Sequence, residues 1–196
     1  MKINHVKVEN FRLLRDVELG LEDRTTLIVG RNNSGKTSIA EIFRRLLSDK
    51  ALNFRFEDFS LGCHEKFWTS FEAVHAGRAA TDVLELLPYI RITLDIAYDV
   101  DAPDLGPLSD CIIDLNPNCS FARVVLTFGP HSTAANMLFA DLPSPEADMA
   151  AARAALFRVL GSRIPAAYNS SLEAVDPNDE ANRKTLELNV LTSLLN

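Results

Sequence analysis

The residues with the clearest chemical potential are the eight from Gly30 to Thr37, which read Gly-Arg-Asn-Asn-Ser-Gly-Lys-Thr. They satisfy the phosphate-binding pattern Gly-x-x-x-x-Gly-Lys-[Ser/Thr] without exception. Such a P-loop wraps around a polyphosphate so that successive backbone N–H groups converge on its oxygens, and glycine is needed where a Cβ would collide. The sequence therefore predicts a nucleotide site, although ATPases, GTPases and kinases share this pattern.

Each polar group of the loop has an expected task. Lys36 should reach the β- and γ-phosphates, which makes it the predicted catalytic residue, and the hydroxyl of Thr37 should coordinate Mg²⁺. The helix that follows adds the partial positive charge of its N-terminus. The predicted nucleotide-binding residues are Gly30, Arg31, Asn32, Asn33, Ser34, Gly35, Lys36, Thr37 and Ser38.

The elements needed to hold this loop are predicted around it. Residues Ile3 to Leu21 alternate as a hairpin of two short strands, and Thr25 to Val29 is a continuous β-prone run, typical of a strand buried on both faces of a parallel sheet. From Lys36 to Leu47, apolar residues recur at helical spacing. Strand, glycine-containing turn and helix in this order predict an α/β fold with a P-loop NTPase core in residues 1–50.

The middle of the chain predicts an antiparallel β-subdomain at 88–130. Ile90 to Asp99 alternates apolar and polar residues, which indicates one face in the core and one in water, and Phe121 to Phe128 reads as a further strand. Asp49 to Pro88 shows no clean period and is interpreted as loops around one or two short helices, with Ala79 to Leu87 the best candidate.

The last part, 144–196, is predicted to be helical. Ser144 is a suitable N-cap, Pro145 suits the first helical position, and Gly161 is expected just past the end of the helix. Asn182 to Asn196 is rich in leucine and helix-prone, and it stops without a cap. We therefore expect 1–196 to be the N-terminal part of a larger ATPase domain.

The opening Ile-Asn-His-Val-Lys-Val-Glu-Asn-Phe-Arg-Leu-Leu-Arg-Asp-Val-Glu-Leu and the later Leu-Ile-Val-Gly-Arg-Asn-Asn-Ser-Gly-Lys-Thr-Ser carry a family resemblance. Together they resemble the ABC-type ATPase heads of the RecF and SMC group, and most of all the ATPase domain of overcoming-lysogenization-defect (OLD) nucleases. The specific part of this resemblance covers about the first 60 residues. It implies an ABC ATPase head-like fold with flanking helices, and ATP and Mg²⁺ as cofactors.

The resemblance also implies roles for residues outside the loop. In such heads the Asn-Phe-Arg turn, here ending in Arg12, brings the hairpin near the nucleotide; the alternative is a solvated hairpin charge. The chain contains no glutamine for a Q-loop. Asp58, in Phe56-Glu57-Asp58-Phe59, is the candidate for the corresponding contact to Mg²⁺, with a loop or cap carboxylate as the alternative.

Several motifs that hydrolysis requires in an ABC head are not found. These are a Walker B strand ending in Asp-Glu, a signature motif and a switch histidine; the nearest run, Cys111 to Asp114, lacks the following Glu. The acidic run of Asp99, Asp101 and Asp104 is interpreted as a solvated turn, with a metal site as the alternative. We therefore expect this segment to grip MgATP but to be inactive by itself.

The bulk composition sets limits on the class of protein. The net charge of −7 argues against a domain that coats nucleic acid through its overall field. Three widely spaced cysteines fit neither a disulfide framework nor a zinc site. No segment is long and apolar enough to span a bilayer, and the N-terminus lacks the apolar core of a secretion signal, so a cytoplasmic location is expected.

Three functions remain open from the sequence. The first is the ATPase domain of an OLD-like nuclease in phage defence or DNA processing, with a second ATPase head, DNA and a separate effector or nuclease protein as expected partners. The second is a RecF- or SMC-like ATPase without its own nuclease, which a long coiled coil beyond residue 196 would favour. The third is a scaffold module whose nucleotide is rarely hydrolysed.

Overall fold

A single antiparallel sheet forms the centre of the molecule. The computed structural model describes residues 2–48, 52–99, 105–113 and 119–195. Within these ranges the strand order is β2-β1-β3-β4-β5-β6, and every pairing is antiparallel. The strands are β1 (Lys2–Phe11), β2 (Leu14–Gly20), β3 (Ile90–Ala97), β4 (Phe121–Pro130), β5 (Tyr168–Val175) and β6 (Arg183–Leu186).

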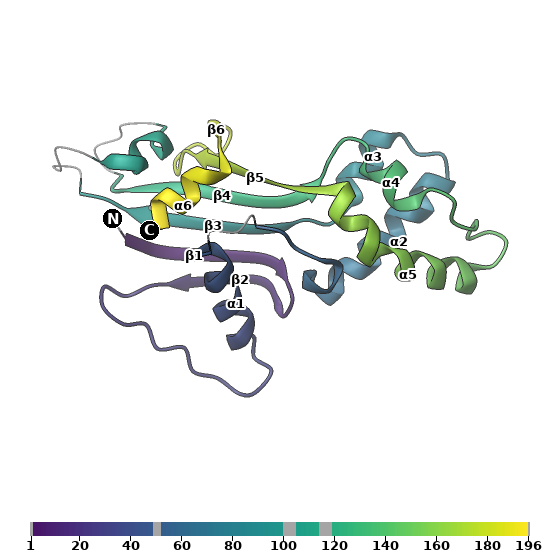
Figure 1. Ribbon diagram of the computed structural model, residues 1–196, viewed down its shortest axis with the longest axis horizontal. Coiled ribbons are helices and arrows are strands. Elements are labelled where there is room, and N and C mark those ends of the chain that lie inside the picture. Colours follow the sequence, from purple (N-terminus) through teal and green to yellow (C-terminus); the bar gives the residue numbers. More distant parts are fainter. Residues whose placement is uncertain (1, 49–51, 100–104, 114–118, 196) are drawn as a thin grey trace.

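The helices lie around this sheet in separate groups. Figure 1 shows α2 to α5 gathered beyond one end of the sheet, whereas α1 lies beside the β1–β2 hairpin. None of the helices in the described ranges is long and apolar enough to cross a membrane. The helices are α1 (Lys36–Leu46), α2 (Leu61–His75), α3 (Ala80–Leu86), α4 (Ala134–Phe139), α5 (Met149–Ala167) and α6 (Leu188–Leu195), with the short 3-10 helices η1 (Phe56–Asp58) and η2 (Gly106–Cys111).

The alternation predicted for the middle of the chain is confirmed by β3. Its apolar residues Ile90, Ile92, Leu94 and Ile96 are each 1% exposed, and β4 pairs with β3 along its whole length. These strands do not form a sheet of their own, because β1 pairs with the other edge of β3. The N-terminal hairpin and the predicted β-subdomain are therefore one continuous sheet.

The hairpin itself is also confirmed, and its turn is tight. Phe11 pairs with Leu14, so Arg12 and Leu13 alone form the turn. Arg12 has a left-handed φ of 49°, which is uncommon for a residue with a side chain. Its backbone N–H donates to the carbonyl oxygen of Asp58 at 2.8 Å, which holds the turn against the segment that contains η1.

The predicted buried strand at Thr25 to Val29 is wrong. This segment has no regular secondary structure, and Leu27 and Val29 are 82% and 78% exposed. A strand needs a neighbouring strand, parallel or antiparallel, to pair its backbone, and within the described residues no strand pairs with this segment. β-propensity without such neighbours does not produce a strand. The helix expected after it is confirmed as α1.

The predicted bounds of the helix at 144–161 are wrong at both ends. Its N-cap is Asp148, whose carboxylate accepts from the N–H of Ala151 at 2.9 Å. The helix passes through Gly161 and Pro165 to Ala167 because its buried stripe continues there. A deeply buried stripe outweighs the unfavourable propensities of one glycine and one proline. The stripe consists of Ala152, Leu156, Leu160, Ile164 and Ala167, each 0% exposed.

Further differences concern segments whose periodicity is weak. Asp49 to Pro88 contains the 15-residue α2 in addition to α3, and β5 was not expected. The helix expected from Asn182 is present only as α6, because residues before it pair with β5, as in Leu186 with Leu172. Two predictions fall partly outside the described ranges: the acidic run at residues 100–104, and the Walker B candidate at residue 114.

Candidate phosphate-binding site

The predicted loop sits between the exposed segment after β2 and the first turn of α1. Gly35 is the N-cap of α1 and has φ 90° and ψ 0°, a left-handed conformation that favours glycine. A Cβ at this position would lie 2.9 Å from Cδ2 of Leu14, the residue that follows the hairpin turn. Leu14 is 2% exposed and has little room to move. The second glycine of the motif is therefore required both by conformation and by packing.

The side chain of Lys36 folds into the loop that precedes it. Its Nζ donates to the carbonyl oxygen of Gly30 at 2.5 Å and to that of Arg31 at 2.6 Å, and it lies 3.3 Å from Oγ of Ser34. The ammonium group thus contacts three oxygen atoms of the loop itself. A phosphate is a stronger acceptor for this group than neutral carbonyl oxygens, because both partners are then charged.

A cavity of about 330 Å³ opens at this loop. The wall consists of Leu13 from the hairpin turn and the consecutive residues Asn32, Asn33, Ser34, Gly35, Lys36, Thr37 and Ser38. Thr37 is exposed, so its hydroxyl is accessible to a metal ion, whereas Ser38 is buried. The cavity is at the small end of the range for ligand sites, about 300–1,000 Å³. Its mostly polar wall suits a phosphate chain better than a base.

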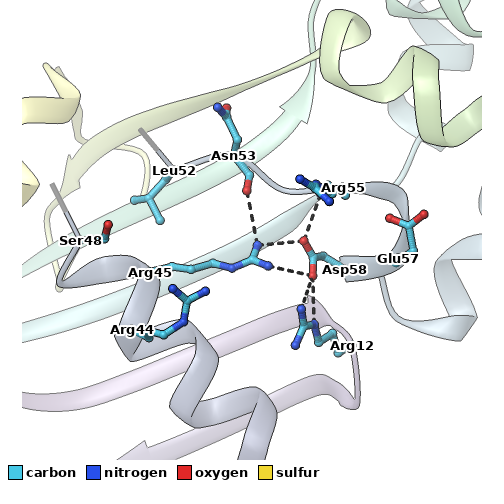
Figure 2. Close-up of a pocket in the computed structure, with 9 residues that line it drawn as sticks. All are labelled: Arg12, Arg44, Arg45, Ser48, Leu52, Asn53, Arg55, Glu57 and Asp58. Atoms are coloured by element: carbon cyan, nitrogen blue, oxygen red, sulfur yellow. Dashed lines mark hydrogen bonds and ion pairs between the residues drawn. The ribbon is translucent and has the colours of Figure 1, made fainter. Parts of the chain in front are cut away.

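A second and larger cavity, of about 620 Å³, lies toward the C-terminal end of α1 (Figure 2). Its lining is rich in arginine and includes Arg12, so the two residues of the hairpin turn line different cavities. The lining residues are Arg12, Arg44, Arg45, Ser48, Leu52, Asn53, Arg55, Glu57 and Asp58.

The polar contacts in the wall of this second cavity converge on Asp58. Its side chain is 4% exposed, and Figure 2 shows guanidinium groups approaching its carboxylate from Arg12 and from Arg45. Oδ1 accepts from Nε of Arg12 at 2.9 Å, and Oδ2 accepts from Nη1 of Arg45 at 2.8 Å and from the backbone N–H of Arg55 at 3.1 Å. Burial alone would raise the pKa of Asp58, but Arg45, the Arg55 N–H and Arg12 together lower it below its ordinary value.

The two residues predicted outside the loop are thus joined to each other. To coordinate Mg²⁺, Asp58 would have to release an arginine, and to reach a nucleotide, Arg12 would have to use the N–H groups that face away from Asp58. The roles of Asp58 as a metal ligand and of Arg12 as a nucleotide contact stay predictions.

Sequence reasoning missed the arginines of α1. Glu41 accepts from Nη2 of Arg44 at 2.7 Å and from Nε of Arg45 at 2.8 Å. These arginines, Arg44 first, lower the pKa of Glu41 to about 2. The spacings of three and four residues are visible in the sequence as helical ion pairs. The link onward to Asp58 spans 13 residues and a change of direction, and it leaves no such signal.

Comparison with known proteins bears on this geometry. The family described as "AAA ATPase domain" matches residues 1–187 of the chain. The matched range contains the loop, both cavities and the whole six-stranded sheet. No curated protein matches the chain.

Proposed function

This chain belongs to the AAA ATPase domain family, and from this premise we propose that it binds MgATP at Gly30 to Thr37 as the ATPase domain of an OLD-like nuclease. Membership of the family supports nucleotide binding and ATPase activity in general. The observation that carries the site is the position of Lys36. Its ammonium group lies within the loop, directly after a left-handed Gly35 at the N-terminus of α1.

The residues present fit a triphosphate and its metal ion. On binding, Nζ of Lys36 would exchange the carbonyl oxygens of Gly30 and Arg31 for phosphate oxygens. The free N–H groups at the start of α1 and its dipole would favour the same negative charge. The exposed hydroxyl of Thr37 would hold Mg²⁺. The metal ion supplies neutralisation of the phosphate charge, and the loop holds the phosphates in one orientation.

Catalysis is proposed to require residues beyond this set. Lys36 stabilises negative charge that develops on the γ-phosphate, which is an electrostatic contribution. The base that orients the attacking water would be a Glu outside residues 1–196. The resemblance to OLD nucleases further supports a second ATPase head, DNA and a nuclease or effector protein as partners. Phage defence or DNA processing is the setting that this assembly suggests.

The test is the affinity for MgATP of the wild-type chain and of Lys36→Ala, measured by isothermal titration calorimetry. We expect the dissociation constant to rise at least about tenfold, equivalent to about 1.4 kcal/mol, because the lost ammonium is the positive charge that the loop holds for the phosphates. Lys66→Ala is the matched control, since Lys66 is an exposed lysine on α2. Equal affinities of wild type and Lys36→Ala would refute the assignment of the site. In the full-length protein, ATP turnover should disappear in Lys36→Ala.

A further inference from the structure

We propose that Asp58 is a positioning residue for the nucleotide site: it ties the hairpin turn and α1 together and so fixes the direction in which α1 presents Gly35 and Lys36. The proposal rests on the function proposed above, that this loop binds MgATP. It assigns Asp58 an effect on nucleotide affinity that does not require contact with the nucleotide or its metal ion.

Several segments of the chain meet at the buried carboxylate of Asp58. Nε of Arg12 donates to Oδ1 at 2.9 Å, and Nη2 of Arg12 forms an ion pair with the same oxygen at 2.9 Å. Arg45 donates to Oδ1 from Nη2 at 3.1 Å and to Oδ2 from Nη1 at 2.8 Å. The carbonyl oxygen of Asp58 accepts from the backbone N–H of Arg12 at 2.8 Å. The hairpin turn, η1 and α1 therefore meet at Asp58.

The guanidinium groups of both arginines also lie over aromatic rings. The guanidinium of Arg45 lies 5.5 Å from the ring centroid of Phe11 and 5.2 Å from that of Phe54, and that of Arg12 lies 5.1 Å from Phe11. Both rings are buried. Stacking on aromatic faces restricts the plane of each guanidinium. Asp58 thus meets two donors that also contact buried aromatic rings.

The hairpin contacts α1 at two places, one near each end of the helix. The hairpin contacts this helix at its N-terminus, where Leu14 packs against Gly35, and again through Arg12, Asp58 and Arg45. Gly35 and Arg45 are ten residues apart, which is about 15 Å along a helix. These two attachments act together with the buried side chains of Ile39, Ile42 and Leu46 to hold the direction of the helix axis. Loss of the second attachment would loosen the C-terminal end of α1 relative to the hairpin, and the resulting change in helix direction would shift Lys36.

The alternative is that Asp58 is only a structural ion pair. The chain offers a matched pair to separate the two roles: Asp95 on β3 binds Arg123 on β4, with Oδ1 to Nε at 2.7 Å and Oδ2 to Nη2 at 2.8 Å. The side chain of Asp95 is 9% exposed, close to the 4% of Asp58. It lies within the sheet, however, and does not contact α1 or the loop through these bonds.

The experiment compares Asp58→Asn with Asp95→Asn by titration with MgATP, at a temperature where circular dichroism shows both to be folded. We expect the dissociation constant to rise about tenfold in Asp58→Asn, by analogy with the lower end of the loss of metal affinity, about tenfold, when residues that orient metal ligands are changed. Asp95→Asn should bind as the wild type does. Equal affinities of Asp58→Asn and wild type, or equal losses in both variants, would overturn the proposal.

A milder pair of variants covers the case in which Asp58→Asn does not fold. Arg45→Lys keeps the charge but cannot form the two-pronged contact with Asp58, and Arg123→Lys is its counterpart in the sheet. Only Arg45→Lys should weaken MgATP binding. The same criterion applies: equal affinities of the two lysine variants contradict a positioning role.

A measurement without nucleotide separates this proposal from the proposed function. Amide hydrogen exchange in the first turn of α1 should be faster in Asp58→Asn or Arg45→Lys than in the wild type, and unchanged in the sheet variants. If the wild type does not bind MgATP, the proposed function fails while this exchange still decides the positioning role. Exchange that is identical in the wild type and both cavity variants overturns the positioning role.

Discussion

Replacing Gly35 by alanine should destabilise the chain more than a glycine substitution that disturbs the backbone alone. Two effects act together at Gly35: a left-handed φ of 90°, and a new Cβ that would lie 2.9 Å from Cδ2 of the buried Leu14. Gly77 shares the first effect only, since its φ is 71° and nothing lies within 4 Å of its Cβ position. Gly20 shares neither.

The magnitudes follow from these three environments. A left-handed conformation costs an L-residue about 1–2 kcal/mol, and extra volume in a packed site costs about 1–3 kcal/mol. Against this, alanine restricts the unfolded chain and contributes about 0.4–1 kcal/mol of stability wherever its conformation is allowed. We therefore expect Gly20→Ala to be neutral or slightly stabilising, and Gly35→Ala to lower the free energy of unfolding by about 1–3 kcal/mol more than Gly77→Ala.

The assay is urea unfolding, followed by the fluorescence of Trp68 and by far-ultraviolet circular dichroism. Trp68 is the only tryptophan and is 5% exposed, so it reports the loss of the core. Equal free energies of unfolding for Gly35→Ala and Gly77→Ala would contradict this prediction. Such a result would mean that Leu14 yields without cost, and that the hairpin does not fix the N-terminus of α1 by packing.

Two further predictions follow from the buried ionisable groups. The folded state lowers the pKa of Asp58, so the stabilisation by its carboxylate is present above the ordinary pKa and is lost as the pH falls through the folded-state pKa. The difference in unfolding free energy between wild type and Asp58→Asn should therefore stay constant from pH 8 to 5 and shrink below about pH 4. A difference that is unchanged at pH 3 contradicts this prediction. Burial raises the pKa of the Cys111 thiol to about 11, and all three cysteines are buried. A thiol reagent at pH 8 should therefore label the native chain far more slowly than the urea-unfolded chain, and rapid labelling of folded protein would show that the thiols are accessible.

Much of the sheet was predictable because its sequence pattern has a single interpretation. In β3 the apolar residues Ile90 to Ile96 alternate strictly with polar ones, and only a strand with one buried face produces that period. The hairpin before the loop and the helix after it were predicted for the same reason. Burial also explains the failure at α5, where a continuing stripe carries the helix through Gly161 and Pro165.

The apolar run Thr25 to Val29 shows the limit of that reasoning. Composition indicates a strand, but a strand exists only where neighbouring backbones pair with it, and no strand of the described sheet pairs with this segment. Likewise, the β6 residues Arg183–Leu186 are helix-prone in sequence and became a strand because β5 was free to pair. Pairing is a property of the tertiary structure and is not encoded in a short window.

The sequence by itself was enough to predict a phosphate loop, because the reasons for its glycines, lysine and threonine are local. Gly35 needs its left-handed φ, and Lys36 reaches back only six residues to the carbonyl oxygen of Gly30. Only the tertiary structure decided how that loop is held. The contact between Arg12 and Asp58 joins residues 46 apart, and the contact between Arg45 and Asp58 joins a helix to a separate segment. Such contacts depend on how the chain returns to itself in space, and the spacing of residues along the sequence does not specify it.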